Sequence, residues 1–215
     1  MSVRLTFIVL TLTLLSTPSR ADRFYVSDDA SPSGDGASWE TAFTFLQDAL
    51  DQTVAGRGDE IWIEEGTYYP DDGANVTEGD RTSSFLLVDR VALYGGFSGT
   101  ETRIEERNKE SNTSILSGEI NNNQDFWAFS VCTVTGGEIR LNDLTVLKGG
   151  GNNIPDGFGG GGAVSSDTAT IKAFNCTFSN NSGTRGVVSN GGTWTVTNCT
   201  FSNNSGTRGV VSNGG

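Results

Sequence analysis

Residues 175–192 read NCTFSNNSGTRGVVSNGG, and the same eighteen residues return unchanged at residues 198–215. Cys176 recurs as Cys199, so the repeat has a period of 23 residues, which lies in the range of solenoid proteins. An identical internal repeat of this length predicts that the chain stacks one structural unit on the next.

A weaker copy of the same pattern lies upstream of the two identical repeats. The three aligned segments are residues 139–146 (IRLNDLTV), 171–178 (IKAFNCTF) and 194–201 (WTVTNCTF). In each segment apolar residues alternate until Asp143, Asn175 or Asn198 breaks the phase, and alternation resumes one residue later. Two short strands that meet at a bend produce this pattern when both bury side chains in one interior. Asn and Asp suit the bend because they tolerate a left-handed backbone.

The remainder of each repeat predicts a third strand and further turns. A polar loop (SNNSGTR) follows the second strand, and a Gly-Val-Val segment and a Gly-Gly turn come after it. Three short strands within 23 residues predict one coil of an all-β, right-handed, single-stranded parallel β-helix, the pectate-lyase-like solenoid. A helical solenoid would need longer units than these.

Stacked coils place equivalent residues of successive repeats about 4.8 Å apart. The expected stacks are Cys176 with Cys199, Phe178 with Phe201, Val187 with Val210, and Asn175 with Asn198. We predict that the two Asn residues form a side-chain ladder along the bend. The cysteine pair is predicted to be an apolar stack, with a disulfide or a reactive thiol as the alternatives.

An amphipathic helix is predicted ahead of the repeats, over residues 38–54. Its apolar residues recur at spacings of three and four, Ser38 is placed to be the N-cap, and Gly56 follows the last apolar residue. Five later segments have the composition of strands: residues 61–63, 85–88, 91–94, 113–116 and 126–134. Because the open end of a solenoid exposes apolar interior, we expect the helix to cap the N-terminal end.

The first residues predict export from the cytoplasm. Arg4 precedes an uncharged apolar run over residues 5–15, and small residues up to Ala21 complete a secretory signal peptide. The run is shorter than the roughly 20 residues that span a bilayer, and no transmembrane span is expected after its removal. Removal of the signal peptide also removes Arg4 and Arg20 and leaves 12 basic and 26 acidic residues, a net charge of −14. We therefore expect no binding to nucleic acid.

The composition excludes the catalytic groups that depend on histidine. The chain has no histidine, which removes the commonest general base and every Ser-His or Cys-His pair. Its three cysteines are too far apart in the sequence to form a metal-binding motif. We therefore predict no catalytic, cofactor-binding or metal-binding residue.

The charged residues also give no pattern of a polysaccharide-cleaving site. Arg185 and Arg208 form a column in the aligned coils with no acidic column beside them, whereas calcium-dependent lyases need clustered carboxylates. The acidic doublets at residues 28–29 and 71–72 lie in turn-like contexts ahead of the repeats. An enzyme is therefore the less favoured interpretation.

One segment has the alternating oxygen side chains of a calcium-binding loop. They are Glu119, Asn121, Asn123 and Asp125. The segment lacks the central glycine and the distal glutamate of an EF-hand, so a polar connection between coils is the competing interpretation. We keep calcium as a hypothesis and otherwise expect no cofactor.

Gly-Gly-Ala-Val occurs at residues 161–164, and Phe-x-x-Asn occurs at residues 178–181 and 201–204. Four N-terminal segments accompany these motifs: residues 34–50, 58–70, 92–107 and 113–120. In these features the chain resembles secreted right-handed β-helix proteins related to the polymorphic outer-membrane proteins of bacteria, which repeat Gly-Gly-Ala-Ile and Phe-x-x-Asn. The resemblance implies a secreted or surface protein, often an adhesin, and it supplies no enzymatic activity.

The expected organisation is a signal peptide at residues 1–21, an N-terminal strand and capping helix at residues 22–57, and β-helix coils at residues 58–215, truncated at the C-terminal end. We expect a non-catalytic protein, secreted or at the cell surface or outer membrane, that acts by adhesion or by contact with a glycan of a host or neighbouring cell. The alternative is a polysaccharide lyase or glycoside hydrolase whose active site lies in coils beyond Gly215. An open last coil would favour self-association.

Overall fold

The computed structural model describes residues 20–121, 123–150, 162–183, 187–206 and 211–213. Nearly all of the predicted signal peptide lies outside these residues, as do Arg185, Arg208 and Val210, so the predictions that involve them stay untested. Within the described ranges, no helix is long and apolar enough to cross a membrane.

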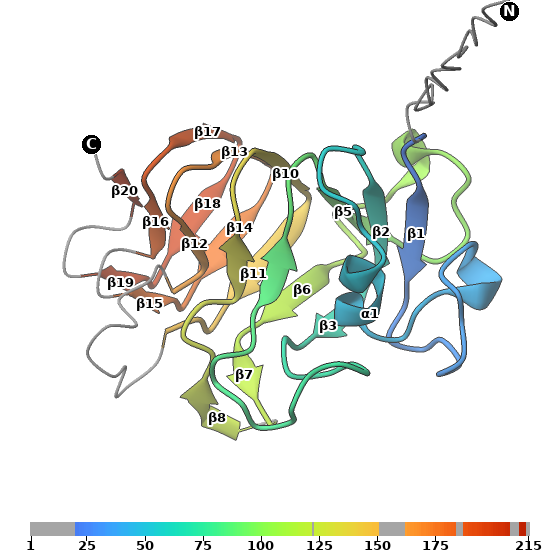
Figure 1. The fold of residues 1–215 in the computed structure, drawn as a ribbon, viewed down its shortest axis with the longest axis horizontal. Coiled ribbons are helices and arrows are strands. Elements are labelled where there is room, and N and C mark those ends of the chain that lie inside the picture. Colours follow the sequence, from blue (N-terminus) through green and yellow to red (C-terminus); the bar gives the residue numbers. More distant parts are fainter. Residues whose placement is uncertain (1–19, 122, 151–161, 184–186, 207–210, 214–215) are drawn as a thin grey trace, which may run out of the picture.

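Most of the strands in the described chain belong to three sheets of parallel strands (Figure 1). Sheet A contains, in spatial order, β1 (Arg23–Val26), β2 (Glu60–Glu64), β5 (Ala92–Phe97), β10 (Glu138–Asn142), β13 (Thr170–Phe174) and β17 (Thr193–Thr197). Sheet B contains β3 (Gly66–Tyr68), β6 (Ser114–Ser117), β11 (Leu144–Leu147), β14 (Thr177–Ser179) and β18 (Thr200–Ser202). Sheet C contains β4 (Phe85–Leu87), β9 (Cys132–Val134), β12 (Val164–Ser166), β16 (Val188–Asn190) and β20 (Val211–Asn213). Two small sheets pair β15 (Ser182–Gly183) with β19 (Ser205–Gly206) and, antiparallel, β7 (Glu119–Ile120) with β8 (Asn123–Trp127).

The chain visits the three sheets in turn and then returns to the first. Strands β10, β11 and β12 lie in sheets A, B and C, and β13, β14 and β16 repeat that order one position further along each sheet. The same order occurs again in β17, β18 and β20. This cyclic path of parallel strands fits a β-helix, and the predicted mostly-β class is confirmed.

The strand register confirms the alignment of the three repeats. Ile139 pairs with Ile171, and Ile171 pairs with Trp194, across β10, β13 and β17. Phe178 pairs with Phe201 in sheet B, where the two rings stack with their centroids 5.0 Å apart and their planes inclined by 16°. The 23-residue period therefore corresponds to one full coil.

The predicted bends also lie where the phase of the sequence breaks. Asp143, Asn175 and Asn198 have φ angles of 55°, 52° and 53°, which is the left-handed region. However, Asn175 and Asn198 are exposed, and no side-chain hydrogen bond joins them. The prediction of an asparagine ladder at this bend was wrong, because the left-handed backbone turns the side chains toward solvent.

An asparagine ladder exists instead at the last residue of the Phe-x-x-Asn units, where Asn181 is buried and Asn204 is partly buried. The side chain of Asn204 donates from Nδ2 to the carbonyl of Phe178 (2.7 Å) and accepts at Oδ1 from the backbone N–H of Asn181 (2.9 Å). Asn181 repeats this one coil earlier: its Nδ2 donates to the carbonyl of Val146 (3.0 Å), and its Oδ1 accepts from the N–H of Gly149 (2.9 Å). Each Asn therefore satisfies two backbone groups of the preceding coil.

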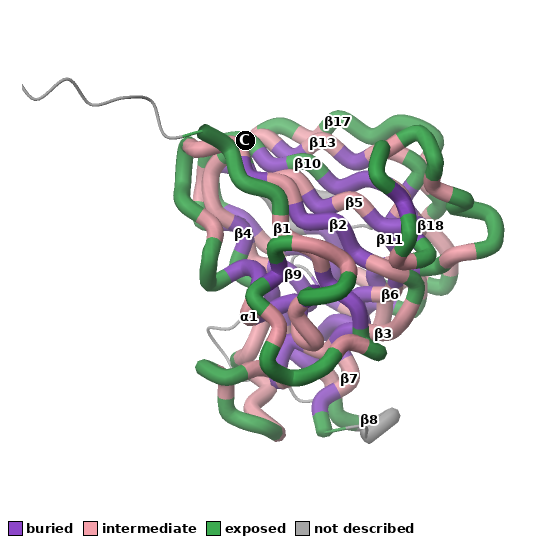
Figure 2. The backbone as a smooth tube through the Cα atoms, turned by 90° about the vertical axis from the view of Figure 1, so that its right-hand side faces the viewer, coloured by how far each residue is buried: buried purple, intermediate pink, exposed green. Residues whose placement is uncertain are grey.

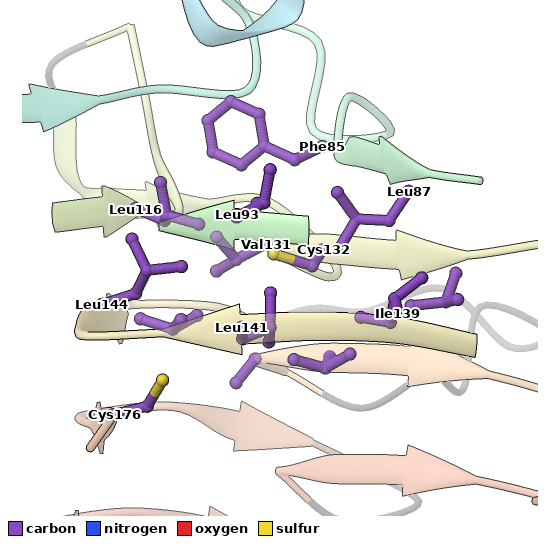
Figure 3. Packing of buried hydrophobic residues seen from close by; sticks show 14 of the residues in the cluster. Phe85, Leu87, Leu93, Leu116, Val131, Cys132, Ile139, Leu141, Leu144 and Cys176 are labelled. Atoms are coloured by element: carbon purple, nitrogen blue, oxygen red, sulfur yellow. The ribbon is translucent and has the colours of Figure 1, made fainter. Parts of the chain in front are cut away.

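The interior is a continuous apolar core that receives side chains from all three sheets. Along sheet A the inward column is Ile61, Leu93, Leu141 and Ala173, each of them fully buried. In Figure 2 the buried residues lie mainly on the strands and the exposed ones mainly in the connecting segments, whereas β17 at the last coil is mostly exposed. In Figure 3, Leu93 and Leu141 from sheet A lie among Leu116 from sheet B and Cys132 from sheet C.

The continuous helix predicted over residues 38–54 is wrong. Two short helices replace it: the 3-10 helix η1 (Trp39–Thr41) and the α-helix α1 (Leu46–Asp51). Between them Phe43 pairs with the edge of sheet A, since its N–H donates to Tyr25 (2.9 Å) and its carbonyl accepts from Ser27 (3.0 Å). These hydrogen bonds satisfy the open edge of β1, and the extended backbone that they require interrupts the helix.

Helix α1 lies at the N-terminal end of the sheets, beside β1 and β2 (Figure 1). It packs against β1, β2 and β4, and its buried residues Leu46, Ala49 and Leu50 belong to the apolar core. The predicted strand over residues 126–134 is also interrupted, because β8 ends at Trp127 and β9 begins at Cys132. Both differences lie in the coils that precede the repeats.

Candidate functional site

The acidic residues singled out in the sequence mainly hold loops. Asp28 accepts a hydrogen bond from the N–H of Thr67 (3.1 Å). Asp71 is buried and accepts from the N–H groups of Gly79 (3.1 Å) and Asn121 (2.9 Å). One residue of each doublet therefore accepts hydrogen bonds from backbone groups of neighbouring loops.

The structure describes only part of the segment over residues 119–125 that was predicted as a possible calcium-binding loop. Glu119 forms an ion pair with Lys148 (2.5 Å), and Asn121 has a left-handed backbone with φ at 53°. The side chains of Asn123 and Asp125 lie outside the described part of the structure. In that part, no three His, Cys, Asp or Glu side chains gather in a way that could hold a metal ion. The calcium hypothesis stays untested.

A hollow of about 540 Å³ lies on the outer face of sheet A, and its lining residues come from two neighbouring coils. They are Asp89, Arg90, Val91, Ala92, Glu138, Ile139 and Arg140. One outward row of the sheet runs through it, formed by Arg23, Glu60, Ala92, Arg140, Lys172 and Thr195. Ala92 has the smallest side chain of this row and lies between two long charged ones, which leaves the space open.

Hydrogen bonds to the next coil fix the conformation of the turn at Asp89 and Arg90, which borders the hollow. Arg90 has a φ of 66°, and its N–H donates to the carbonyl of Glu138 (2.6 Å). Asp89 accepts from the N–H of Glu138 (2.8 Å), so the two coils are joined on both sides of Arg90. Gly137 has a φ of 73°, and a Cβ there would lie 2.0 Å from Oδ1 of Asp89. Glycine is required at this position because any side chain would displace the Asp89 carboxylate.

The charged groups of the hollow are not equally paired. Glu138 forms an ion pair with Lys172 (2.7 Å) on the next coil. Arg140 lies over the ring of Phe174, 5.6 Å from its centroid. The guanidinium of Arg90 forms no hydrogen bond or ion pair with any described residue. Arg140 also forms a side-chain hydrogen bond with Tyr94. The exposed Arg90 guanidinium is therefore the positively charged group of the hollow that has no side-chain partner among the described residues.

An aromatic side chain stands next to the hollow. Tyr94 follows Ala92 on the outward face of β5 and is half-buried. Burial raises the pKa of Tyr94, the charge of Glu60 adds to this effect, and Arg140 acts in the opposite direction. The phenol is therefore neutral and offers both an apolar ring and a hydroxyl group.

A second, smaller groove of about 300 Å³ lies at the other end of β10. It is lined by Lys109, Asn112, Thr113, Asp143, Leu144, Thr145, Asn175 and Thr177. Asp143 forms ion pairs there with Arg107 (3.0 Å) and Lys109 (3.4 Å). Hydroxyl, amide and ammonium groups line this groove, and it meets the outer face of sheet A at the bend.

Comparisons with known proteins give no assignment of family. No protein-family model and no curated protein match the sequence. A solved structure described as a rhamnogalacturonan lyase is similar at 12% sequence identity and a TM-score of 0.27, over 86% of this chain and 62% of that chain. This chain thus spans less than two thirds of the length of that lyase, and a TM-score this low indicates that the two backbones do not superpose closely.

The cysteines are free thiols with different environments. Cys132 and Cys176 are buried, whereas Cys199 is partly exposed. Cys199 accepts at Sγ from the N–H of Cys176 (3.3 Å). Contact with the Cys176 side chain, together with the hydrogen bond from the Cys176 N–H, lowers the pKa of Cys199 to about 6 despite its partial burial, and burial raises the pKa of Cys132 to about 12. The contact between Cys176 and Cys199 therefore includes a hydrogen bond as well as apolar packing.

We expect iodoacetamide to modify Cys199 first at pH 7, because the thiolate is the reactive form and only Cys199 is ionised there. The rate should rise with pH through about 6 and level off above it. Mass spectrometry of peptides after short exposure measures the site and the rate. A Cys199→Ser chain should take up almost no label, and early labelling of Cys132 would contradict the expectation.

Proposed function

We propose that this protein is an exported, non-catalytic, right-handed parallel β-helix that binds a glycan through the hollow above Ala92. The observation that supports the proposal is the combination of a hollow of about 540 Å³, two guanidinium groups that form no ion pair with a described residue, and a neighbouring tyrosine ring. Polar side chains that fix hydroxyl groups and an aromatic ring that covers an apolar sugar face are the usual parts of a small-molecule site.

A binding role is favoured over cleavage of the glycan. Glycoside hydrolysis uses two carboxyl groups that flank the bond, one as acid and one as base or nucleophile. In the hollow both carboxylates are engaged: Asp89 accepts from the Glu138 N–H, and Glu138 is paired with Lys172. The chain has no histidine that could act in their place.

The proposed location is outside the cell or on its surface. The signal peptide expected at residues 1–21 and the net charge of −14 after its removal support export and solubility. The resemblance to β-helix proteins related to the polymorphic outer-membrane proteins supports an adhesive role. The glycan would then belong to a host or to a neighbouring cell.

Filling the hollow tests the proposal. We expect an Ala92→Leu chain to lose about tenfold or more in affinity for any glycan that the mature wild-type chain binds, because the added side chain occupies the space above β5. A glycan array identifies the ligands, and isothermal titration calorimetry measures the affinity of each chain.

The matched control is Thr195→Leu, which enlarges an outward residue of the same row three strands away. It should change the affinity by less than about twofold. Failure of the wild-type chain to bind any glycan on an array of neutral and acidic structures would overturn the proposal, as would equal affinities of the wild-type and Ala92→Leu chains.

A further inference from the structure

The two arginines that line the hollow differ from four other arginines in forming no ion pair within the described part of the chain. Four arginines elsewhere are held by carboxylates: Arg23 by Glu60, Arg57 by Asp22 and Asp59, Arg103 by Glu106, and Arg107 by Asp143. Arg90 and Arg140, the two that line the hollow, form no ion pair with any described residue. Of the other two described arginines, Arg20 is exposed at the first described residue, and Arg81 donates to the backbone carbonyls of Trp127 (2.6 Å) and Gly150 (3.2 Å). Two guanidinium groups without a carboxylate partner in one hollow call for an explanation in a chain with 26 acidic and 14 basic residues.

The acidic residues of the hollow do not neutralise these arginines. The Asp89 carboxylate is directed to the N–H of Glu138 (2.8 Å), where it orders the turn. The Glu138 carboxylate is directed to Lys172 (2.7 Å) on the next coil. Lys172 offsets the charge of Glu138, so the four charged lining residues together with Lys172 leave one net positive charge. The local sign is the opposite of the sign of the whole chain.

We infer that the hollow takes a carboxylate of an acidic glycan, with Arg90 and Arg140 holding a uronic acid residue. This inference rests on the proposed glycan binding and names the class of ligand. A guanidinium group presents parallel N–H donors that match the two oxygens of a carboxylate, which a neutral sugar cannot use in the same way. The ring of Phe174 lies beneath the Arg140 guanidinium and limits the directions in which it can point.

The geometry also explains why the site stays open to such a ligand. Ala92 removes the bulk that would cover the two arginines, and Gly137 allows Asp89 to bond the backbone of Glu138. With the Asp89 carboxylate held there, the Arg90 guanidinium has no partner among the described residues. Tyr94 stands next to this position on β5, where its hydroxyl can bond a sugar hydroxyl.

The test compares one glycan with and without its charge. Oligomers of polygalacturonate and of hyaluronan are titrated into the mature wild-type chain by calorimetry, beside the same oligomers after chemical reduction of their carboxylates to primary alcohols. We expect at least one acidic oligomer to bind about tenfold or more tightly than its reduced form. The preference should weaken as sodium chloride is raised, because salt screens the exposed charges.

Three single substitutions locate the effect. Arg90→Ala and Arg140→Ala should each lose about tenfold in affinity for the acidic oligomer and change affinity for the reduced form by less than about twofold. Arg103→Ala is the matched control, because it removes one positive charge from an exposed arginine that forms an ion pair with Glu106 away from the hollow. It should leave both affinities within about twofold of the wild-type values.

The outcomes separate this inference from the proposed function. Equal affinities for an acidic oligomer and its reduced form, both lowered by Ala92→Leu, would overturn the uronate inference while glycan binding stands. Preference for the acidic form that Arg103→Ala weakens as much as Arg90→Ala would also overturn it. Absence of binding to every oligomer would overturn the inference, and absence on the glycan array as well would overturn both. Full competition by free glucuronate would support the inference and identify the single sugar acid as the group recognised.

Discussion

Replacing Phe178 with alanine is expected to lower the free energy of unfolding by about 4 kcal/mol. Phe178 is fully buried, stacks on Phe201 of the next coil at 5.0 Å, and meets Trp194 edge-on at 5.9 Å. The substitution removes a large apolar side chain and leaves a cavity that neighbouring coils cannot close, because their strands are fixed by the register of sheet B. Urea unfolding followed by circular dichroism measures the change.

Phe174→Ala is the matched control for this prediction. Phe174 lies four residues earlier, on the outward face of β13, and is only partly buried. Its loss should cost about 1 kcal/mol, chiefly through its contact with Arg140. Equal losses for the two substitutions would mean that Phe178 does not lie in the interior as described.

The second large effect is expected for Asn181→Ala, which should lower the free energy of unfolding by about 3 kcal/mol. Asn181 is 1% exposed, and its side chain bonds Gly149, Val146 and Asn204. Alanine would leave a backbone N–H and a carbonyl of the preceding coil buried without their partner, and such groups are costly. Urea unfolding again measures the loss, and hydrogen exchange at the Gly149 amide should become faster.

Asn180→Gly gives the comparison for Asn181. Asn180 is the adjacent residue, exposed, with a φ of 56° that glycine adopts without strain. Its replacement should change the free energy of unfolding by less than about 0.5 kcal/mol. A larger loss at Asn180 than at Asn181 would show that the bend, and not the asparagine ladder, joins the coils.

The architecture could be predicted from the repeat because the two identical segments and their weaker copy bury side chains in the same alternating pattern. Residues 139–146 share few letters with residues 171–178, yet both must alternate, bend and alternate again to face one interior. This requirement is local in sequence and recurs at a fixed period. The bend at Asp143 was predicted for the same reason and is confirmed.

The ladder was placed at the wrong residues because the sequence does not say which Asn faces inward. Asn175, Asn180 and Asn181 are chemically alike, and two of them occupy left-handed bends that expose their side chains. Asn181 directly follows a bend, and its side chain points into the interior. There it bonds the N–H of Gly149 and the carbonyl of Val146 in the previous coil. Its place as the last residue of Phe-x-x-Asn was the available signal.

The helix and the hollow depended on pairings between distant segments. Phe43 leaves the helical conformation because it forms hydrogen bonds with the edge of β1. Helix propensity describes only neighbouring residues, so it could not predict these bonds. The hollow needs Ala92 to lie between Glu60 and Arg140, and irregular connections separate these three residues in the sequence. Outside the repeats no period fixes such a register, so composition alone could not locate the site.

The hydrogen bonds of Asn181 and Asn204 have one direction, since each side chain reaches back to the coil before it. A coil added by copying the 23-residue unit would bring its own Asn to the same backbone groups and its own Phe to the same stack. Each added coil would therefore lengthen the molecule by about 4.8 Å and would make the same contacts as the coils already present. Variants that differ in the number of units would share one interior and differ only in how far they extend.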